Sequence, residues 1–299
     1  MVKGLGLILY GIKINTDTNL IYDFDVQTSY KYELTLQQTP PQTLKEAITC
    51  GFKLYQAHGR KVYLYSNQEF DAYLPNQPWC YEVDGIVKFY WYSNHKTIYY
   101  EKLDHFTDQL LGFWFTHLML PFFMALERFY EIIHAGAVEI DNKAVLFIAP
   151  SMGGKSTTTD FFIKQNHTLI SDDKVSTFFE QNKLYAVGSH PYHRPYRKFE
   201  ELGYRVDNFT TSFKPIHAIY QLKKTIPTDT ITIKEINGFE KFNTLLPNYL
   251  FSFPWTKAQR MKNLTDILNS VKVFEITIPW DKQRLIEVYE KICEHSQNI

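Results

Sequence analysis

No part of the sequence limits the possible folds more than residues 149–157, which are Ala149-Pro150-Ser151-Met152-Gly153-Gly154-Lys155-Ser156-Thr157. An apolar run from Ala144 to Ile148 precedes them, and a segment that can form a helix, Thr157 to Lys164, follows. A strand, a loop of small residues with Gly-Lys-Ser, and a helix are together typical of a phosphate-binding loop. The sequence therefore predicts that this stretch holds phosphate groups.

Each residue type in this loop has a physical reason to be there. Successive backbone N–H groups line a concave loop, and the following helix adds the positive end of its dipole. Lys155 would reach the outer phosphates as a mobile charge, and the Ser156 hydroxyl would ligate a magnesium ion held by them. Gly153 and Gly154 let the backbone approach without a Cβ in the way.

The loop departs from the strict pattern in one place, because Ala149 stands where that pattern begins with Gly. The alternative interpretation is a structural turn with a surface lysine. The strand before the loop and the helix after it favour the phosphate-binding interpretation.

Charge and cysteine content exclude several classes of protein. The chain of 299 residues has 32 basic and 32 acidic residues, so no overall positive field attracts nucleic acid or an anionic membrane. Its three cysteines, Cys50, Cys80 and Cys293, are odd in number and widely spaced, which argues against a disulfide framework or a zinc site. The glycine-broken N-terminus lacks a cleavage site, so we expect a cytoplasmic protein.

One segment, Leu110 to Leu126, is free of formal charge and approaches the length of a short membrane span. It contains Thr116, His117 and Pro121, and true spans need about 20 apolar residues. We expect a buried helix that bends or restarts at Pro121.

We expect two domains without a clean linker between them: a β-rich N-terminal accessory domain, residues 1–103, and a catalytic domain that contains the phosphate-binding loop, residues 104–299. In the first part, Leu5 to Ile14 and Leu20 to Val26 have the composition of strands, and Gly85 to Glu101 has that of a hairpin. Its aromatic residues suit cross-strand pairs and a core better than a ligand platform.

Further along, a strand from Ile133 to Ile140, an Asp141-Asn142 turn and the return strand form a predicted hairpin, so His134 lies one hairpin from the loop. A short strand then delivers Ser171-Asp172-Asp173. Paired aspartates at a strand end, one helix after a phosphate loop, suit a magnesium ligand and a base. Alone, they would equally suit a turn or a helix cap.

The polar run Gly188 to Lys198 is rich in basic and aromatic residues and contains two prolines, which predicts an irregular loop. Arg194 and Arg197 are candidates for stabilising charge on a phosphoryl group, and a solvated surface loop is the alternative.

The spacing of His134, the loop ending at Lys155-Ser156, and Asp172-Asp173 resembles the catalytic core of HPr kinase/phosphorylase and its relatives. The layout is most similar to HPr-kinase-related proteins that accompany ribosomally made peptides, notably lasso-peptide kinases. The resemblance implies an α/β fold: an HPr kinase/PEP carboxykinase-like P-loop core with a mixed β-sheet and flanking helices, here joined to the β-rich N-terminal domain.

The resemblance also implies roles for residues. ATP would bind to Ala149, Pro150, Ser151, Met152, Gly153, Gly154, Lys155, Ser156 and Thr157. Lys155, His134 and Asp172 would be catalytic, with Asp172 favoured as the base. Ser156 and Asp173 would hold Mg²⁺, although the two aspartates are interchangeable on sequence alone.

Two departures from that family bear on the loop and on the substrate. Met152 stands where the family usually has Gly, and we expect Gly153 to take over the unusual backbone angle. The Arg-Gly-Leu-Gly-like signature of the bifunctional HPr enzymes is not visible, which argues against phosphorylase activity and against HPr as the substrate.

The function expected from these features is an ATP- and Mg²⁺-dependent kinase that phosphorylates a serine-type hydroxyl of a peptide or protein, such as a ribosomally made precursor peptide. A kinase of a small metabolite such as free serine, or a nucleotide-binding regulator without transfer, are the alternatives. We expect no nucleic-acid or membrane partner, and the resemblance implies a homo-oligomer.

Overall fold

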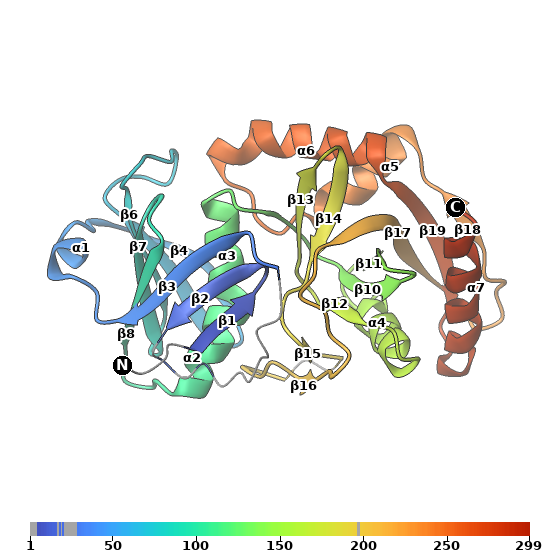
Figure 1. Cartoon of the computed structure of the whole chain (residues 1–299), viewed down its shortest axis with the longest axis horizontal. Helices are drawn as coiled ribbons and strands as arrows, with labels where there is room; N and C mark the ends of the chain where they lie inside the picture. Colours follow the sequence, from blue (N-terminus) through green and yellow to red (C-terminus); the bar gives the residue numbers. More distant parts are fainter. Residues whose placement is uncertain (1–4, 17, 19, 21–28, 196–197) are drawn as a thin grey trace. The chain divides into compact units, whose positions relative to one another are not determined.

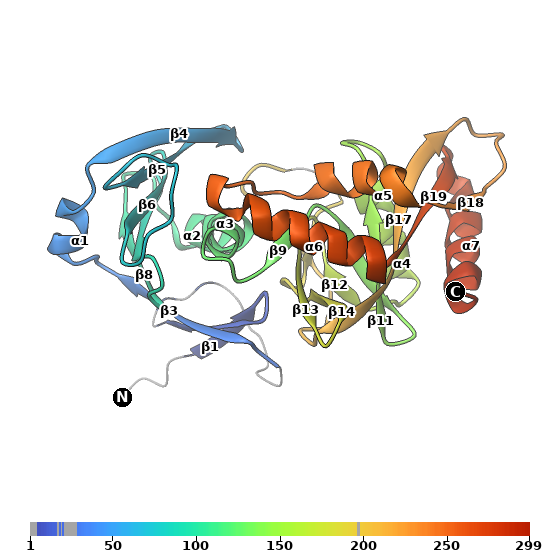
Figure 2. The ribbon, with the colours of Figure 1, turned by 90° about the horizontal axis from the view of Figure 1, so that it is seen from above.

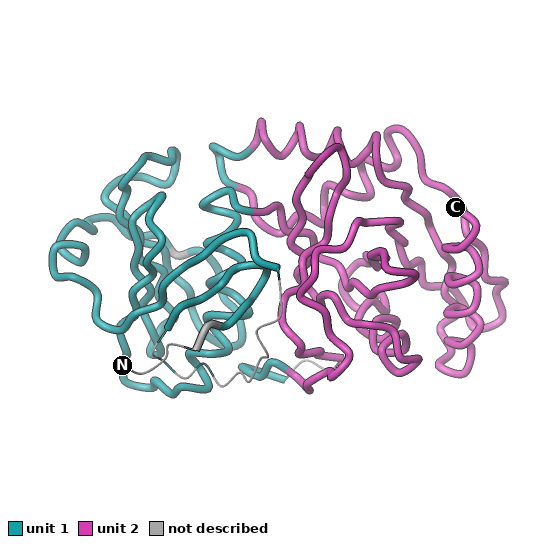
Figure 3. The backbone as a smooth tube through the Cα atoms, in the orientation of Figure 1, with its two compact units in different colours: residues 1–129, 198–202, 253–256 teal, residues 130–197, 203–252, 257–299 magenta. Residues whose placement is uncertain are grey.

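The structure is a computed structural model that describes residues 5–16, 18, 20, 29–195 and 198–299. Most of the expected strand Leu20 to Val26, and Arg197, lie outside the described residues. Contacts divide the chain into two compact units, residues 1–129, 198–202 and 253–256, and residues 130–197, 203–252 and 257–299 (Figure 3). The first unit thus includes the helical segment after residue 104, which we expected in the second domain.

The first unit is built around an eight-stranded sheet in the order β1-β2-β3-β8-β7-β6-β5-β4. The β-rich character expected of the N-terminal part is confirmed, and the predicted hairpin is β7 and β8. The elements are β1 (Leu5–Leu9), β2 (Ile12–Thr16), β3 (Tyr32–Gln38), α1 (Gln42–Glu46), β4 (Cys50–Ala57), β5 (Arg60–Ser66), β6 (Pro78–Val83), β7 (Val87–Tyr92) and β8 (Thr97–Lys102).

The apolar segment that resembles a membrane span is a core helix of this unit. Asp108–Leu126 has 19 residues and a mean hydropathy of 1.4, enough to cross a membrane by length and composition, but 78% of it is buried inside the structure. It comprises α2 (Asp108–Trp114), a π-helical turn (Phe115–Met119) and α3 (Leu120–Leu126), so the predicted irregularity at Pro121 is confirmed.

Aromatic residues hold this helix on the sheet. Ring centroids lie 5.3 Å apart for Tyr81 and Phe122, 5.9 Å for Phe89 and Phe115, and 5.6 Å for Trp91 and Phe123. These distances are typical of favourable aromatic pairs, so the abundant aromatics of the N-terminal part form a core, as expected.

The second unit contains a nine-stranded mixed sheet. Its strands follow the order β12-β10-β11-β17-β14-β13-β9, and β19 pairs with both β17 and β18. They are β9 (Glu131–Ile133), β10 (Gly136–Ile140), β11 (Lys143–Ile148), β12 (Leu169–Ser171), β13 (Val175–Glu180), β14 (Lys183–Val187), β17 (Lys214–Thr225), β18 (Ile233–Glu235) and β19 (Lys272–Pro279); a small ribbon, β15 (Tyr192–His193) and β16 (Tyr204–Arg205), lies apart.

Helices cover both faces of this sheet, because alternate residues of its strands point to opposite sides. Leu146 and Ile148 of β11 pack in one core with α5 (Gly238–Leu245) and α6 (Lys257–Ser270). Val145 and Phe147 pack in a second core with α4 (Lys155–Lys164) and α7 (Leu285–Gln297). In the view of Figure 1, α5 and α6 lie at the top and α4 at the lower right; Figure 2 shows α6 lengthwise.

The predicted strand, loop and helix are confirmed as β11, residues 149–154 and α4. The predicted turn is also confirmed, because Asp141 and Asn142 take positive φ between the antiparallel strands β10 and β11. Mixed strands, flanking helices and a P-loop, joined to a β-rich N-terminal unit, are the α/β fold class expected from the sequence.

Close backbone packing holds α4 against β10. A Cβ placed on Gly136 would lie 2.1 Å from Oγ1 of Thr159, whose hydroxyl donates a hydrogen bond of 3.0 Å to the carbonyl oxygen of Lys155. Gly136 therefore lets the second turn of α4 approach the strand, and so fixes where Lys155 lies.

We expect Gly136→Ala to displace α4 and to lower the free energy of unfolding by about 1–3 kcal/mol, the usual cost of overpacking a core. Chemical denaturation measures this. The double variant Gly136→Ala/Thr159→Ala should recover part of the loss, since it removes the hydroxyl oxygen that the added methyl group would meet. An unfolding free energy of Gly136→Ala equal to that of the wild type would contradict the close approach.

Candidate active site

The candidate site lies where one short antiparallel ladder, β9 with β13, gives way along the chain to another, β10 with β12. Ile133 pairs with Val175, and Ala137 pairs with Ser171, so the residues between these pairs face each other across the ladder without regular pairing. They are His134, Ala135 and Gly136 on one strand, and Asp172, Asp173 and Lys174 on the other. The expected continuous strand from Ile133 to Ile140 is therefore wrong, and its break places His134 opposite the aspartates.

Asp173 lies at the centre of this site. Its Oδ1 is 2.9 Å from Nε2 of His134 and 3.5 Å from Nζ of Lys155, and its Oδ2 is 2.9 Å from Nζ of Lys174. Its φ of 70° is left-handed, and the turn is fastened by a hydrogen bond of 2.7 Å from the Ser171 hydroxyl to the carbonyl oxygen of Lys174. The carboxylate thus connects the P-loop lysine with both broken strands.

Asp172 occupies a different environment, although it is the neighbour of Asp173. It is only 4% exposed, and its Oδ2 accepts a hydrogen bond of 2.8 Å from the backbone N–H of Arg194. Burial acts to raise the pKa of Asp172, but His193 and the Arg194 amide outweigh it, so this pKa lies below its usual value. Asp172 is therefore ionised at neutral pH.

His193 packs between two carboxylates. The ring is fully buried; its Nδ1 is 3.0 Å from Oδ2 of Asp172, and its Nε2 is 3.8 Å from Oδ1 of Asp160 on α4. Neither ring nitrogen has an aligned hydrogen-bond partner among the described residues, so these are close contacts without hydrogen-bond geometry. Asp160 also accepts a hydrogen bond of 2.6 Å from the Tyr204 hydroxyl. His193 thereby links Asp172 to the helix of the P-loop.

The P-loop backbone is left-handed at two residues, Met152 with φ of 64° and Gly154 with φ of 90°. Gly153 is not among the residues with positive φ, so the expectation that Gly153 takes over the unusual angle is wrong. Gly153 has another role: a Cβ there would lie 2.8 Å from Cβ of Ala149 and 2.9 Å from the carbonyl oxygen of Pro150. The loop therefore closes tightly over its own first residues.

The first turn of α4 presents unsatisfied donors. Gly154 caps the helix in a left-handed conformation without a side-chain cap, and the N–H groups of Gly154, Lys155 and Ser156 have no backbone acceptor within the described part of the chain. Orphan N–H groups at a helix N-terminus favour an anion such as a phosphate. The loop residues from Ala149 to Thr157 thus fit the group that the sequence predicts for them.

Lys155 is buried next to these donors, with 8% of its surface exposed. Burial lowers its pKa, and the carboxylates of Asp173 and Asp172 oppose that shift. A desolvated ammonium with a single direct carboxylate contact gains from a second anionic partner. This environment suits a lysine that binds a phosphate.

A dedicated metal cage is absent from the residues described: no three His, Cys, Asp or Glu side chains gather around one point. Magnesium needs no such cage, because one or two protein oxygens, phosphates and waters complete its shell. Ser156, at the partly exposed start of α4, and Asp173, with 34% of its side chain exposed, are the oxygen ligands that fit.

Several residues of the site were not singled out from the sequence. Lys174, Asp160 and Tyr204 were missed. The run from Gly188 to Lys198 was expected either to offer Arg194 and Arg197 to a phosphoryl group or to be a solvated surface loop. In the structure this run also supplies His193 and the Arg194 backbone N–H to Asp172. Burial lowers the pKa of the nearby His190 to about 4, so that ring stays neutral. In the sequence, the feature that could have pointed to this role was the pair of histidines, His190 and His193, in the run.

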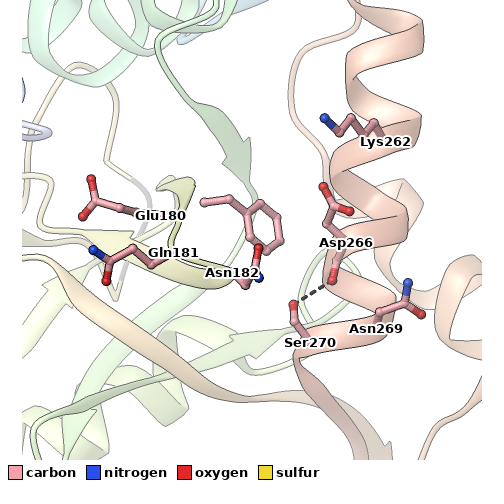
Figure 4. A pocket seen from close by; sticks show the side chains of 8 residues that line it. Glu180, Gln181, Asn182, Lys262, Asp266, Asn269 and Ser270 are labelled. Carbon is pink, nitrogen blue, oxygen red and sulfur yellow. Dashed lines mark hydrogen bonds between the residues drawn. The ribbon is translucent and has the colours of Figure 1, made fainter.

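A separate hollow of about 500 Å³ lies between the turn of β13 and β14 and helix α6. Figure 4 shows its polar lining, in which the Ser270 hydroxyl donates a hydrogen bond of 2.6 Å to the Asp266 carbonyl oxygen. The residues named above for phosphate, proton or metal binding do not line it.

No protein-family model matches the chain, and no curated protein matches it. Among solved structures, it is similar to the HPr(Ser) kinase/phosphatase of Coxiella burnetii, with a TM-score of 0.36 and 16% identity over 56% of this chain and 97% of that chain. A likeness this small does not establish a shared family, so the function has to follow from the site residues.

Met152 provides a test of the loop geometry, because its side chain is 88% exposed but its φ is left-handed. Substitutions at exposed positions usually change stability by less than about 0.5 kcal/mol. A β-branched residue is disfavoured at positive φ, so we expect Met152→Val to destabilise by about 1–2 kcal/mol and Met152→Gly to be tolerated. Chemical denaturation of both variants measures this, and equal stability of Met152→Val and wild type would contradict the left-handed turn.

Proposed function

We propose that this chain is a kinase that uses ATP and Mg²⁺ to phosphorylate a serine-type hydroxyl of a peptide or protein. One observation carries the proposal. Where the strand pairing is interrupted, the P-loop lysine Lys155 lies beside two aspartates, of which Asp172 is buried and Asp173 is partly exposed. Phosphoryl transfer needs little covalent chemistry from the protein, and depends on positioning and on charge stabilisation. The residues around the break divide these tasks.

Phosphate binding is the task of the loop and of Lys155. The orphan N–H groups of Gly154, Lys155 and Ser156 would donate to phosphate oxygens, and the Lys155 ammonium would move from Asp173, 3.5 Å away, toward the transferred group. Mg²⁺, held by the phosphates with Ser156 and Asp173, would supply further neutralisation of their charge.

Proton acceptance is the task of Asp172. Its Oδ2 is held by the Arg194 N–H, whereas its Oδ1 is buried and has no hydrogen-bond partner among the described residues. An ionised carboxylate with one oxygen held and one unused is oriented to accept a proton from a substrate hydroxyl. His193, 3.0 Å from Oδ2, is a positioning residue for this base.

His134 and Lys174 place Asp173 rather than act on the substrate directly. Both contact its carboxylate at 2.9 Å, from opposite strands of the break. Asp173 is thereby fixed beside Lys155, where an oxygen ligand for the metal is needed. The arrangement supports the assignment of Asp172 as the base and Asp173 as the metal ligand.

The nature of the acceptor is the finer part of the proposal. We propose a serine on a peptide or protein, such as a ribosomally made precursor peptide, because the size and layout of the chain resemble kinases of that kind. The same site chemistry would serve free serine, and the assay below therefore includes both acceptors.

Lys155→Ala should lower the rate of phosphoryl transfer by about 100–1,000-fold, the usual loss when one preorganised charge-stabilising group is removed. Transfer of label from γ-labelled ATP to a serine-containing peptide, to free serine and to water measures it. Lys291→Ala is a matched control, because Lys291 is an exposed lysine of the same unit whose partner, Glu294, lies on α7 and is not one of the site residues. A rate of phosphoryl transfer in Lys155→Ala equal to that of the wild type would contradict the kinase assignment. Wild-type protein that binds ATP but labels no acceptor and releases no phosphate would support a nucleotide-binding regulator instead.

Asp172→Asn should reduce kcat by about 100–10,000-fold, the range for general base catalysis, while the Kd for ATP changes by less than about threefold. His193→Gln should give a smaller fall in kcat with the same unchanged affinity, since it leaves the carboxylate in place. Steady-state kinetics and calorimetric titration separate the two quantities. A loss confined to ATP affinity would instead make Asp172 part of the nucleotide or metal site.

A further inference from the structure

Three parallel strands end beside the P-loop. Strand β17 runs parallel to β11 on one side and to β19 on the other. The carboxyl end of β11 leads into the loop at Ala149, that of β17 is Thr225, and that of β19 is Pro279. In α/β sheets, ligands bind outside the carboxyl ends of such strands. The segments that follow β17 and β19 are therefore placed to contact whatever the loop binds.

The residue after β19 reaches the loop itself. Trp280 is tied to the end of β17 by a hydrogen bond of 3.0 Å from its backbone N–H to the Thr225 carbonyl oxygen. A Cβ placed on Gly154 would lie 3.2 Å from ring carbon Cζ3 of Trp280, so the indole packs against the glycine that precedes Lys155. The indole thus borders the turn where the phosphate donors are exposed.

This indole is not a core residue. It is 46% exposed, whereas the three largest fully buried side chains of the protein are also tryptophans, all in the first unit. The Lys224 ammonium lies 3.6 Å from the centroid of the indole, a cation–π contact that covers one face. Lys224 is exposed, and it is the neighbouring Lys223 that pairs with Glu275. A positively charged, half-open aromatic surface therefore adjoins the P-loop.

We propose that Trp280, with Lys224 behind it, is the subsite that stacks the base of the nucleotide whose phosphates the loop holds. The inference rests on the proposed function, and adds to it a residue that selects a nucleoside triphosphate over a bare polyphosphate. Base–aromatic stacking tolerates any base, because each base has a π-face, and a cation on the opposite face adds to the attraction. The free face of the indole would take the base, next to a loop that takes the phosphates.

A structural role for Trp280 makes a different prediction. If the indole only supported the left-handed turn at Gly154, its removal would weaken the binding of phosphates with or without a base attached. If it stacks the base, only ligands that carry a base lose affinity. Tripolyphosphate, which has the three linked phosphates of ATP but no nucleoside, separates the two roles.

The experiment is calorimetric titration of Mg-ATP and of Mg-tripolyphosphate into the full-length wild type, Trp280→Leu and Trp280→Phe. We expect Trp280→Leu to weaken ATP binding by about 10-fold or more, and to leave tripolyphosphate binding within about twofold. Trp280→Phe, which retains a ring, should stay near the wild type. Phe239→Leu is the matched control, since Phe239 is 78% exposed in the same unit and, within the described part of the chain, its ring partner is Phe242.

Equal loss for both ligands in Trp280→Leu would make the indole a support of the loop, and would overturn the stacking inference. No loss of affinity for either ligand in Trp280→Leu would overturn the stacking inference as well. In that case, loss of ATP binding in Lys155→Ala would still support the P-loop assignment. A wild-type protein that binds neither ligand would instead contradict the proposed function, and the inference with it.

Discussion

The contact of the Asp173 carboxylate with three cationic or ionisable side chains is the interaction on which the site depends. His134, Lys155 and Lys174 come from three separate segments, and two of them, Lys155 and Lys174, are buried lysines. A buried ammonium without a partner is strongly unfavourable, so the shared carboxylate of Asp173 stabilises this arrangement of charges. The residues that make these contacts lie where regular strand pairing is interrupted. The cluster of charges and the local irregularity of the sheet therefore coincide.

Two neighbouring aspartates acquire different properties because the left-handed turn at Asp173 sends their side chains into different surroundings. Asp172 faces buried His193 and a backbone N–H, which keep it ionised although burial opposes this. Asp173 faces lysines and remains partly exposed. A base needs a fixed, ionised carboxylate, and a metal ligand needs access to the ion and its phosphates. The distinction follows from the environment, since the two side chains are chemically identical.

Most of the fold was predictable from the sequence where local signals and tertiary packing agree. The apolar run before the P-loop, the Asp141-Asn142 turn and the buried helix around Pro121 have strong local signals, and all three are confirmed. The spacing from His134 through Lys155 to Asp172 and Asp173 singled out residues that the structure brings together. The break at His134 was not predictable, because Ile133 to Ile140 has the composition of one uninterrupted strand, and only its pairing partners reveal the change of neighbour.

The residues that the sequence did not identify contact the site through tertiary structure alone. His193 lies 21 residues after Asp172, and Trp280 lies 126 residues after Gly154, so no local spacing connects either pair. The prediction for the conformation of the P-loop was also wrong. The left-handed φ lies at Met152, although glycine adopts such an angle with less steric strain. Local preference predicted Gly153 there, but its contacts with Ala149 and Pro150 give Gly153 a different role.

Helix α4 has a consequence for how the site keeps its dimensions. Lys155 is its first residue, and Asp160, five residues later, contacts His193, which in turn contacts Asp172. At 1.5 Å per residue, these two positions are about 7.5 Å apart along the helix axis. The helix thus fixes the distance between the P-loop lysine and the carboxylate that contacts His193. Its length is set by peptide geometry, which thermal motion of side chains does not alter.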